Sequence, residues 1–354
     1  MVYTGKREPN PHEPGPSPIS PKWALQRTAK SLLPRSQSLL KCYHVPRAVV
    51  EVWRSPTRET AAYRGLCTCQ SVWCCPVCSA KIAATRAAEL TDAIATHRSN
   101  GGTVLLLTFT HSHTRHDTLA DLVARQMAAH QTFWRQGTVR RLLDQVGYIG
   151  RVSSFEVTFG HSSGWHPHRH VALFVDSSAD PHHVQHHLAS TWSTCAARHG
   201  LTASLDRGLD ARGGEAAGQY VAKLGLEVAL AVRKLGRGER YGVWQLLNHA
   251  PTSAWARCAF IDFARTMKGK RQLVWSKGLK ALLGVDEQTD QDIMESGGDQ
   301  DEAWLADLTH QLWKGVYRNE IRGDLLRLLG IGDVQAARQL LAAYGLDETG
   351  LTTG

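Results

Sequence analysis

The chain of 354 residues is long enough for about two domains that each bury a core, and its 42% hydrophobic and 21% charged residues exclude a fibrous or wholly disordered protein. It contains no run of about 18 apolar residues that would span a membrane, and residues 1–18 lack an apolar signal-peptide segment, so we expect a cytoplasmic protein. The formal net charge of +9 favours an anionic partner, and nucleic acid is the commonest large one.

The first 40 residues predict a disordered tail, because their many prolines support neither a helix nor a strand ladder. After Cys42 the chain is expected to be extended, with a strand over residues 48–53. Residues 41–80 predict a cysteine-rich module, since most of the 8 cysteines fall there. In a reducing cytosol, such clustering indicates a metal site rather than disulfides.

The C-x-x-C sequence at 75–78 supplies one pair of ligands for a tetrahedral zinc ion, and a second pair must lie near it in space. The predicted ligands are Cys42, Cys69, Cys75 and Cys78. Cys67 is a close rival for one place in the second pair, and His44 is a weaker one. We expect a structural Zn²⁺ site, with free core thiols as the alternative.

Residues 81–235 predict one α+β domain. The expected elements are a helix over 79–98, a strand over 103–110, one or two helices over 118–145 with a break near Gly137, strands over 147–159 and 167–175, a helix over 181–199, a strand over 201–205 and a helix over 213–232. From 103 to 206 this order is the split βαβ arrangement of ferredoxin-like domains, an antiparallel sheet with its helices on one face.

Histidines occupy alternate positions, His166, His168 and His170, and run into the apolar stretch 171–175 of a predicted strand. Because strand side chains alternate between faces, His168 and His170 project from the same side, about 6–7 Å apart, and can bind one metal ion together. Pro167 lacks a backbone N–H and is expected at the first residue of the strand or just before it, so His166 ranks below the other two. The alternative is a surface strand rich in histidine.

The last helix of this domain carries Tyr220 and Lys223 on one face, at the spacing i,i+3. A phenol is a poor nucleophile until a neighbouring cation or metal ion stabilises its anion. Lys223 can supply that charge or hold a substrate phosphate. A Tyr-x-x-Lys pair is common by chance, so its value as a signal depends on the other motifs.

The remainder of the chain is less informative. Residues 236–285 mix tryptophans with cations, which is typical either of a DNA-contacting extension or of core residues beside a solvated face. Residues 286–302 are acidic and contain a pair of glycines, which predicts a linker. Residues 303–354 predict a C-terminal helical unit, because 304–329 and 334–344 have helical periodicity.

Three motifs, taken in order, resemble those of the HUH endonuclease superfamily. They are the apolar strand flanked by threonines at 105–110, His-Pro-His-Arg-His-Val-Ala-Leu-Phe from His166, and Tyr-Val-Ala-Lys from Tyr220. Within that superfamily, the cysteine segment ahead of the first motif and the single tyrosine are similar to the rolling-circle replication initiators of actinomycete plasmids. The resemblance covers about residues 42–275.

This resemblance implies that His168 and His170 bind a divalent cation, Mg²⁺ or Mn²⁺. In family members the third ligand comes from a neighbouring strand, which implies Glu156, with His166 as the competitor. A carboxylate suits such a hard ion better than histidines alone. Arg169 departs from the apolar residue that the family prefers between the paired histidines. On a strand it faces away from the metal, so ligation survives.

The resemblance also implies that Tyr220 attacks a phosphodiester of single-stranded or hairpin origin DNA. The products are a 5′-phosphotyrosine and a free 3′-hydroxyl, which primes a host polymerase, and a host helicase is a further implied partner. Release calls for hydrolysis, with Glu215 as the candidate that activates water. Glu215 lies five residues before Tyr220 rather than the expected four, which rotates it off the tyrosine's face of the helix.

Two other functions stay open. A transposase or mobilisation relaxase would use the same nicking chemistry, and the neighbouring DNA would distinguish it from a plasmid initiator. A zinc-containing DNA-binding regulator with an inert histidine strand would bind duplex DNA in a salt-dependent way without cleaving it.

Overall fold

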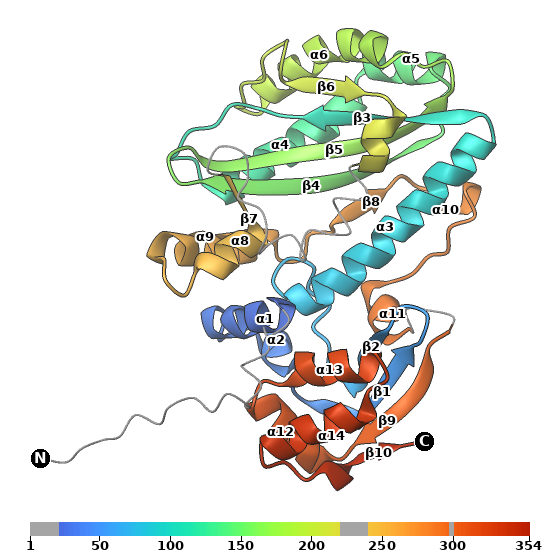
Figure 1. Ribbon diagram of the computed structural model, residues 1–354. Helices are drawn as coiled ribbons and strands as arrows, with labels where there is room; N and C mark the ends of the chain where they lie inside the picture. The colour runs from blue at the N-terminus through green and yellow to red at the C-terminus, as the bar shows by residue number, and fades with distance from the viewer. Residues whose placement is uncertain (1–20, 220–239, 297–300) are drawn as a thin grey trace, which may run out of the picture. The chain divides into compact units, whose positions relative to one another are not determined.

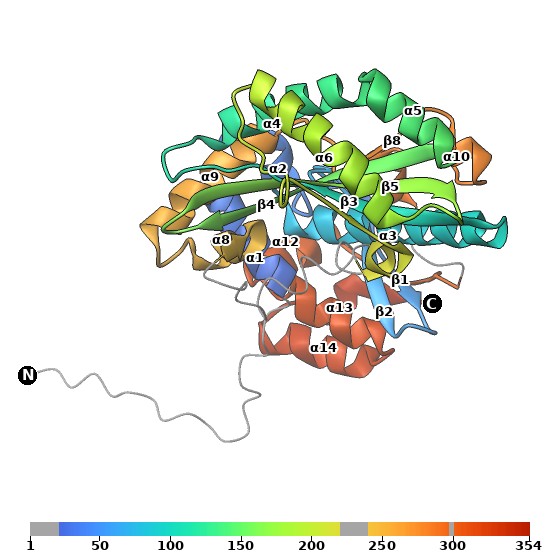
Figure 2. The same cartoon turned by 90° about the horizontal axis from the view of Figure 1, so that it is seen from above.

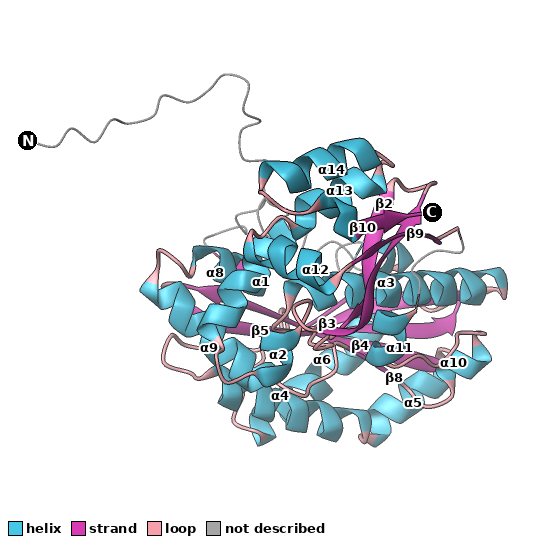
Figure 3. Ribbon diagram, turned by 90° about the horizontal axis from the view of Figure 1, so that it is seen from below, coloured by secondary structure: helices cyan, strands magenta, loops and turns pink. Residues whose placement is uncertain are grey.

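The computed structural model describes residues 21–219, 240–296 and 301–354. The chain divides into two compact units. The terminal unit comprises Met1–Ala24, His44–Leu66 and Asp299–Gly354, and the central unit comprises Leu25–Tyr43 and Cys67–Gly298. Each unit has its own antiparallel sheet, drawn as magenta strands in Figure 3. The predicted α+β class with antiparallel pairing is therefore confirmed.

The central sheet is built around strand β5. Across the sheet the order is β6-β3-β5-β4-β7, and β8 also pairs with β4. The strands are β3 (Gly102–Phe109), β4 (Gly150–Gly160), β5 (Gly164–Asp176), β6 (Leu209–Arg212), β7 (Arg240–Gly242) and β8 (Leu273–Trp275). Because β5 pairs antiparallel with both β3 and β4, its side chains alternate between the two faces at the middle of the sheet.

The helices of the central unit include several that begin at a side-chain cap. Their bounds are α1 (Pro21–Leu32), α2 (Gln37–Lys41), α3 (Pro76–Ser99), α4 (Leu119–Trp134), α5 (Gly137–Gln145), α6 (Pro181–Arg198), α8 (Val243–His249), α9 (Ala254–Met267), α10 (Leu279–Leu282) and α11 (Asp290–Glu295). The side chain of Thr118 caps α4 and that of Asp180 caps α6, each by accepting backbone N–H groups of the first turn. The predicted break near Gly137 separates α4 from α5.

Helices cover both faces of the central sheet (Figures 1 and 2). On one face, Leu90 of α3 packs in a buried cluster with Val104 of β3. On the other, the ring of Phe109 lies 5.2 Å from that of Phe133 in α4 and 5.1 Å from that of Trp192 in α6. The sequence predicts helices on one face only. Because β3 and the second half of β5 are apolar on both sides, α3 covers the second face.

Two strand assignments in this unit differ from the predictions. The strand expected over 201–205 is absent there apart from a single bridge at Thr202, and residues 209–212 form β6 instead. Hydrogen bonds from the N–H groups of Arg207 and Gly208 to Ser204 close a turn in that stretch. Pro167 lies inside β5 rather than at its start. Since β3 pairs with β5 only from Arg169 onward, a missing N–H at Pro167 breaks no ladder bond with β3.

The N-terminal prediction also needs correction. Residues 1–20 of the predicted tail lie outside the described residues. From Pro21 onward the chain forms α1 and then α2, because proline is well tolerated at the first position of a helix and Leu25 and Ala29 are buried.

The terminal unit combines a four-stranded sheet with three α-helices among its described residues. Its elements are β1 (Pro46–Ser55), β2 (Thr60–Leu66), β9 (Ala303–Leu308), α12 (His310–Arg318), α13 (Arg322–Gly330), α14 (Val334–Ala343), the 3₁₀ helix η1 (Glu348–Gly350) and β10 (Leu351–Thr353). The sheet order is β10-β9-β1-β2. Tyr63 lies in its core, with its ring 4.9 Å from that of Trp313 and its hydroxyl donating to the carbonyl of Arg322.

The helical periodicity predicted from Trp304 fails at its start, because residues 303–308 form β9. Ala306 and Leu308 are buried and alternate with less buried neighbours, which is the pattern of a half-buried strand. The strand ahead of this region, predicted over 48–53, is confirmed within β1.

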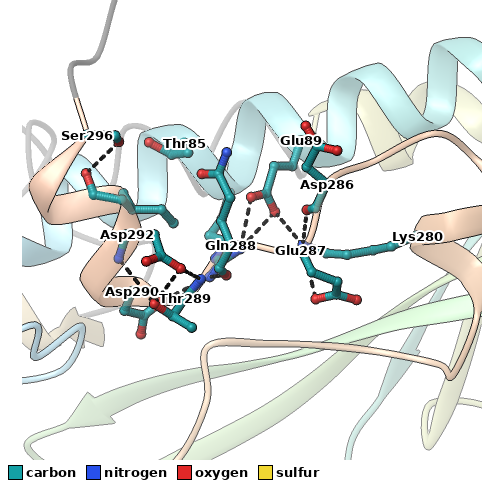
Figure 4. A network of polar contacts seen from close by, with 12 residues as sticks. Thr85, Glu89, Lys280, Asp286, Glu287, Gln288, Thr289, Asp290, Asp292 and Ser296 are labelled. Atoms are coloured by element: carbon teal, nitrogen blue, oxygen red, sulfur yellow. Dashed lines mark hydrogen bonds and ion pairs between the residues drawn. The ribbon is translucent and has the colours of Figure 1, made fainter.

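The described part of the predicted acidic linker up to Ser296 contacts α3 (Figure 4). Arg86 of α3 bridges Glu89 at 2.9 Å and Asp290 at 3.1 Å. The ammonium of the buried Lys280 lies 3.2 Å from Glu89 and donates to the carbonyl of Asp286. A buried cation must be paired, so these contacts hold the segment against the helix.

None of the described helices combines the length and apolar character needed to cross a lipid bilayer.

Replacing Phe109 with alanine tests the core on the α4 and α6 side. Phe109 is 0% exposed, so F109A is expected to lower the free energy of unfolding by about 3–5 kcal/mol. The measurement is urea denaturation followed by tryptophan fluorescence. The control L205A removes a side chain that is 59% exposed and should change stability by no more than about 0.5 kcal/mol. Equal effects of the two variants would contradict this packing.

Candidate active site and metal centre

Strands β4 and β5 bring the predicted histidine site onto one face of the central sheet. Glu156 of β4 stands opposite His168 of β5, and Thr158 stands opposite His166. The rings of His168 and His170 have centroids 6.5 Å apart, as expected for residues i and i+2 of one strand. The carboxylate Oε2 of Glu156 lies 2.8 Å from Nε2 of His170. Two imidazoles and one carboxylate therefore share this face.

Thr108 of β3 supports His170 from the other side. Its Oγ1 lies 3.1 Å from Nδ1 of His170, and the two residues are paired in the β3–β5 register. A hydroxyl can donate or accept, so Thr108 can serve either tautomer of the ring. When Thr108 accepts from Nδ1–H, the lone pair of Nε2 is left available for a metal ion.

Burial sets the charge of the other two histidines. It lowers the pKa of His168 to about 4, although the Glu156 carboxylate acts in the opposite direction. Burial also lowers the pKa of His166 to about 3, helped by His113 and Arg240. Both rings are neutral near pH 7, and a neutral imidazole is the form that binds metal.

His166 makes different contacts from the other two histidines. It lies in register within β5, so the predicted uncertainty caused by Pro167 does not displace it. Its Nε2 lies 2.9 Å from Oγ of Ser163, and its ring centroid is 3.8 Å from that of His113. Glu156 therefore contacts His170, whereas His166 contacts Ser163 and His113.

The donor set of His168, His170 and Glu156 fits a divalent cation in chemistry, since it combines neutral imidazoles with a hard carboxylate. The Glu156 carboxylate contacts His170 directly. The four cysteines described below are the only group of three or more histidine, cysteine or acidic residues, within the described ranges, whose ligand atoms all lie within 4.8 Å of one another. A cation at the histidines would therefore require Glu156 to exchange its contact with His170 for one with the ion.

The helix predicted over 213–232 is described only from Gly214 to Gln219. Ala217 packs in the buried cluster that contains Val104 and Leu106, which is the face of the sheet that carries the histidines. Glu215 is exposed, and its carboxylate accepts a hydrogen bond from Gln219 at 3.2 Å. Tyr220 and Lys223 lie outside the described residues.

Four of the predicted cysteines meet in a buried cluster. The Sγ atom of Cys42 lies 3.8 Å from that of Cys75 and 3.5 Å from that of Cys78, and Cys69 lies 3.7 Å from Cys78. Tetrahedral zinc with Zn–S bonds of about 2.3 Å separates its sulfurs by about 3.8 Å. These four thiols could hold a structural zinc ion, and they are the four cysteines that the sequence predicts as its ligands.

Within the cluster, Cys75 is the thiol that favours the thiolate, whereas hydrogen bonds among the cysteines and burial raise the pKa of Cys69 and of Cys78. Burial raises the pKa of Cys75, but hydrogen bonds from Cys42, Cys69 and Cys78 outweigh burial and hold it well below its usual value. The side chain of Gln26, which is fully buried, donates toward Sγ of Cys42 and of Cys75. Such N–H contacts to sulfur stabilise negative charge around a metal ion.

The rival zinc ligands lie elsewhere. Cys67 is not among the clustered thiols, and its carbonyl accepts the backbone N–H of Tyr43. The ring of His44 stacks on that of Tyr317 with centroids 4.0 Å apart.

Within residues 241–280, the tryptophans are mostly packed against the core and most of the cationic side chains are on the surface. Trp244 is buried, and Trp255 stacks on Phe159 with ring centroids 5.8 Å apart. Arg265 and Lys268 are exposed. For Trp244, the structure favours the core alternative that the sequence left open.

Two supporting residues were not singled out from the sequence. Thr108 lies in the threonine-flanked strand motif, so its position was a usable signal for a partner of His170. Gln26 of α1 precedes Cys42 by 16 residues and Cys75 by 49, and nothing in the local sequence indicates that it reaches their sulfurs.

Replacing individual cysteines with serine tests the zinc site. C69S removes one clustered ligand and should weaken zinc binding by at least about tenfold and lower the melting temperature. C67S is the matched control, because Cys67 is a neighbouring thiol outside the cluster. Atomic emission spectrometry gives the zinc content and a chelator competition gives the affinity. Loss of zinc from C67S but not from C69S would contradict the assignment.

Comparison with known proteins adds independent information. Residues 62–198 match the replication protein family. A protein named Protein rep from Streptomyces lividans is 26% identical over 344 residues, covering 74% of this chain and 75% of that protein. A protein named neomycin resistance protein from Streptomyces cyanogenus is 31% identical over 153 residues, covering 36% of this chain and 35% of that protein. No solved structure matches the chain.

The matched segment contains three of the four clustered cysteines and the residues of the histidine face, whereas Cys42 lies before it. It includes the cysteines from Cys67 to Cys78 and the strands β4 and β5 with Glu156 and the histidines. The resemblance predicted from the sequence is thereby supported: residues 62–198 are similar to the replication protein family, and most of the chain is similar to a protein named Protein rep.

Proposed function

We propose that this protein is a plasmid rolling-circle replication initiator of the HUH endonuclease type, which nicks one strand of origin DNA. The observation that carries the proposal is the shared face of β4 and β5, where His168, His170 and Glu156 lie together. The order β6-β3-β5-β4 supports the ferredoxin-like assignment, since the connections through α4–α5 and α6 follow the predicted sequence of elements. The family match favours replication over transposition.

His168, His170 and Glu156 would hold a Mg²⁺ or Mn²⁺ ion. The bound ion would polarise the scissile phosphate and offset its developing charge. Thr108 positions the His170 ring, and the neutral state of His168 keeps its lone pair available. Glu156 rather than His166 is the proposed third ligand, because its carboxylate already contacts His170.

Tyr220 is the proposed nucleophile. Its oxygen would attack phosphorus, the bond from phosphorus to the 3′ oxygen would break, and that oxygen would leave as a 3′-hydroxyl. The 5′ end would stay bound as a phosphotyrosine, and Lys223 would stabilise the phenolate or the phosphate. The packing of Ala217 supports this role, because it places the residues just ahead of Tyr220 in the sequence on the histidine face.

The exposed Glu215 would activate water for release of the covalent product. The Glu215 carboxylate is exposed and accepts a hydrogen bond from Gln219. To reach the reacting phosphate, the Glu215 side chain would have to move, or the DNA strand would have to bind beside it. The proposed partners are single-stranded or hairpin origin DNA, a host helicase and a host polymerase in the cytoplasm.

Replacing Tyr220 with phenylalanine removes the proposed nucleophilic oxygen. Y220F should form no covalent adduct with a single-stranded origin oligonucleotide in the presence of Mg²⁺ or Mn²⁺, as read by denaturing gel electrophoresis. Y241F is the control, since Tyr241 is a nearby tyrosine on β7 at the edge of the same sheet. An adduct that survives in Y220F and disappears in Y241F would move the nucleophile to Tyr241. No cleavage by the wild type with any divalent metal would favour a DNA-binding regulator.

Replacing the two competing third ligands decides between them. E156Q keeps the size of the side chain but removes its charge, so it should raise the Mg²⁺ or Mn²⁺ concentration needed for half-maximal nicking by at least about tenfold. H166Q should leave that concentration nearly unchanged, because His166 contacts Ser163 and His113 instead. The measurement is the nicking rate against metal concentration. A large effect of H166Q with a small one of E156Q would reverse the assignment.

A further inference from the structure

A cavity of about 420 Å³ lies on the face of the central sheet opposite the histidines. We call it the back pocket, and the lining residues that matter here are His130, Trp134, Arg135, Arg151, Ser153 and Arg169. Arg169 lies between His168 and His170 on β5, so its side chain projects to the other face. The volume lies in the range of small-molecule sites, about 300–1,000 Å³.

The back pocket gathers positive charge without a matching negative charge. Arg135, Arg151 and Arg169 all line it, and none of the described lining residues carries a carboxylate. Aromatic rings hold two of these guanidinium groups, since Cζ of Arg151 lies 4.1 Å from the ring centroid of Trp134 and Cζ of Arg169 lies 4.2 Å from that of Phe155. A guanidinium stacked on a ring keeps the N–H groups in its plane for other partners, and Nη1 of Arg151 already donates to the hydroxyl of Tyr148.

Buried polar atoms in the same place lack partners. His130 is 2% exposed, and neither of its ring nitrogens has a hydrogen-bond partner among the described residues. The Nε atom of Arg169 is likewise buried and unpaired within the described part of the chain. Burial, with a smaller effect from Arg169 and Arg151, holds the pKa of His130 well below its usual value, so the ring is neutral and offers one donor and one acceptor. Such unpaired buried groups call for a bound partner.

A phosphate group can satisfy the arginine N–H groups and the ring nitrogens of His130 in the back pocket. Phosphate oxygens accept hydrogen bonds from arginine forks, and the charge of the anion offsets the mutual repulsion of the clustered guanidinium groups. An indole and a neutral imidazole beside the arginines suit the base and sugar that a nucleotide attaches to its phosphate. We propose that the back pocket binds the phosphate of a nucleotide, either a free mononucleotide or one unit of a DNA strand. This site is separate from the proposed nicking site and does not depend on it.

Calorimetric titration of the full-length protein tests the proposal. The probes are dAMP, deoxyadenosine as the control that lacks the phosphate, and a short oligothymidylate. We expect saturable binding of dAMP or of the oligonucleotide, and binding of deoxyadenosine that is at least about tenfold weaker than that of dAMP. Saturation by dAMP identifies a free nucleotide as the ligand, whereas saturation by the oligonucleotide alone identifies a strand of DNA.

Two arginine variants locate the binding. R135Q and R151Q should each weaken it by about tenfold, and R140Q, an exposed arginine of the neighbouring helix α5, should stay within about twofold of the wild type. Arg135 is exposed and forms no ion pair among the described residues, so R135Q tests charge without disturbing the core. Binding that is equal in R135Q, R151Q and R140Q, or no saturable binding of either nucleotide probe, would overturn the proposal. Because the readout is binding, a failure of the nicking assay leaves this result unchanged.

Discussion

The pairing of β5 between β3 and β4 is the constraint on which the functional geometry depends. Antiparallel register sets Glu156 opposite His168 and Thr108 opposite His170. Because strand side chains alternate, the same register sends Arg169 to the opposite face. A shift of one residue in the pairing of β5 would exchange the two faces and separate Glu156 from the histidines. The long ladder of eleven paired residues between β4 and β5, which runs from Gly150 to Gly160, makes such a shift costly.

The alternating side chains of β5 thereby place different chemical groups on the two faces of the central sheet. The histidine face combines neutral imidazoles with a carboxylate and is bordered by the helix that begins at Gly214. The opposite face combines arginines with aromatic rings and with the buried His130, whose ring nitrogens have no hydrogen-bond partner in the described part of the chain. The proposed cation ligands and the proposed anion donors therefore lie on opposite sides of a single layer of backbone.

Much of this arrangement follows from local sequence patterns, and the exceptions have physical reasons. The alternation around His168 and the break at Gly137 are short-range signals, and the structure agrees with both. The second covered face of the sheet depends on α3 packing across it, and no pattern within β3 indicates which helix covers which side. The strand expected over 201–205 gave way to β6 because hydrogen bonds to Ser204 form a turn before the chain meets β3. Partners distant in the chain, such as Gln26 beside the cysteines, arise only from tertiary packing.

The central claim is that the phenol of Tyr220 reaches a phosphate held on the histidine face. Mass spectrometry of the peptide that stays linked to DNA after nicking tests it most directly. The account predicts a linked peptide that contains Tyr220, formed only when a divalent cation and both His168 and His170 are present. A linkage at any other residue, or one that forms in a protein without His168 and His170, would contradict it.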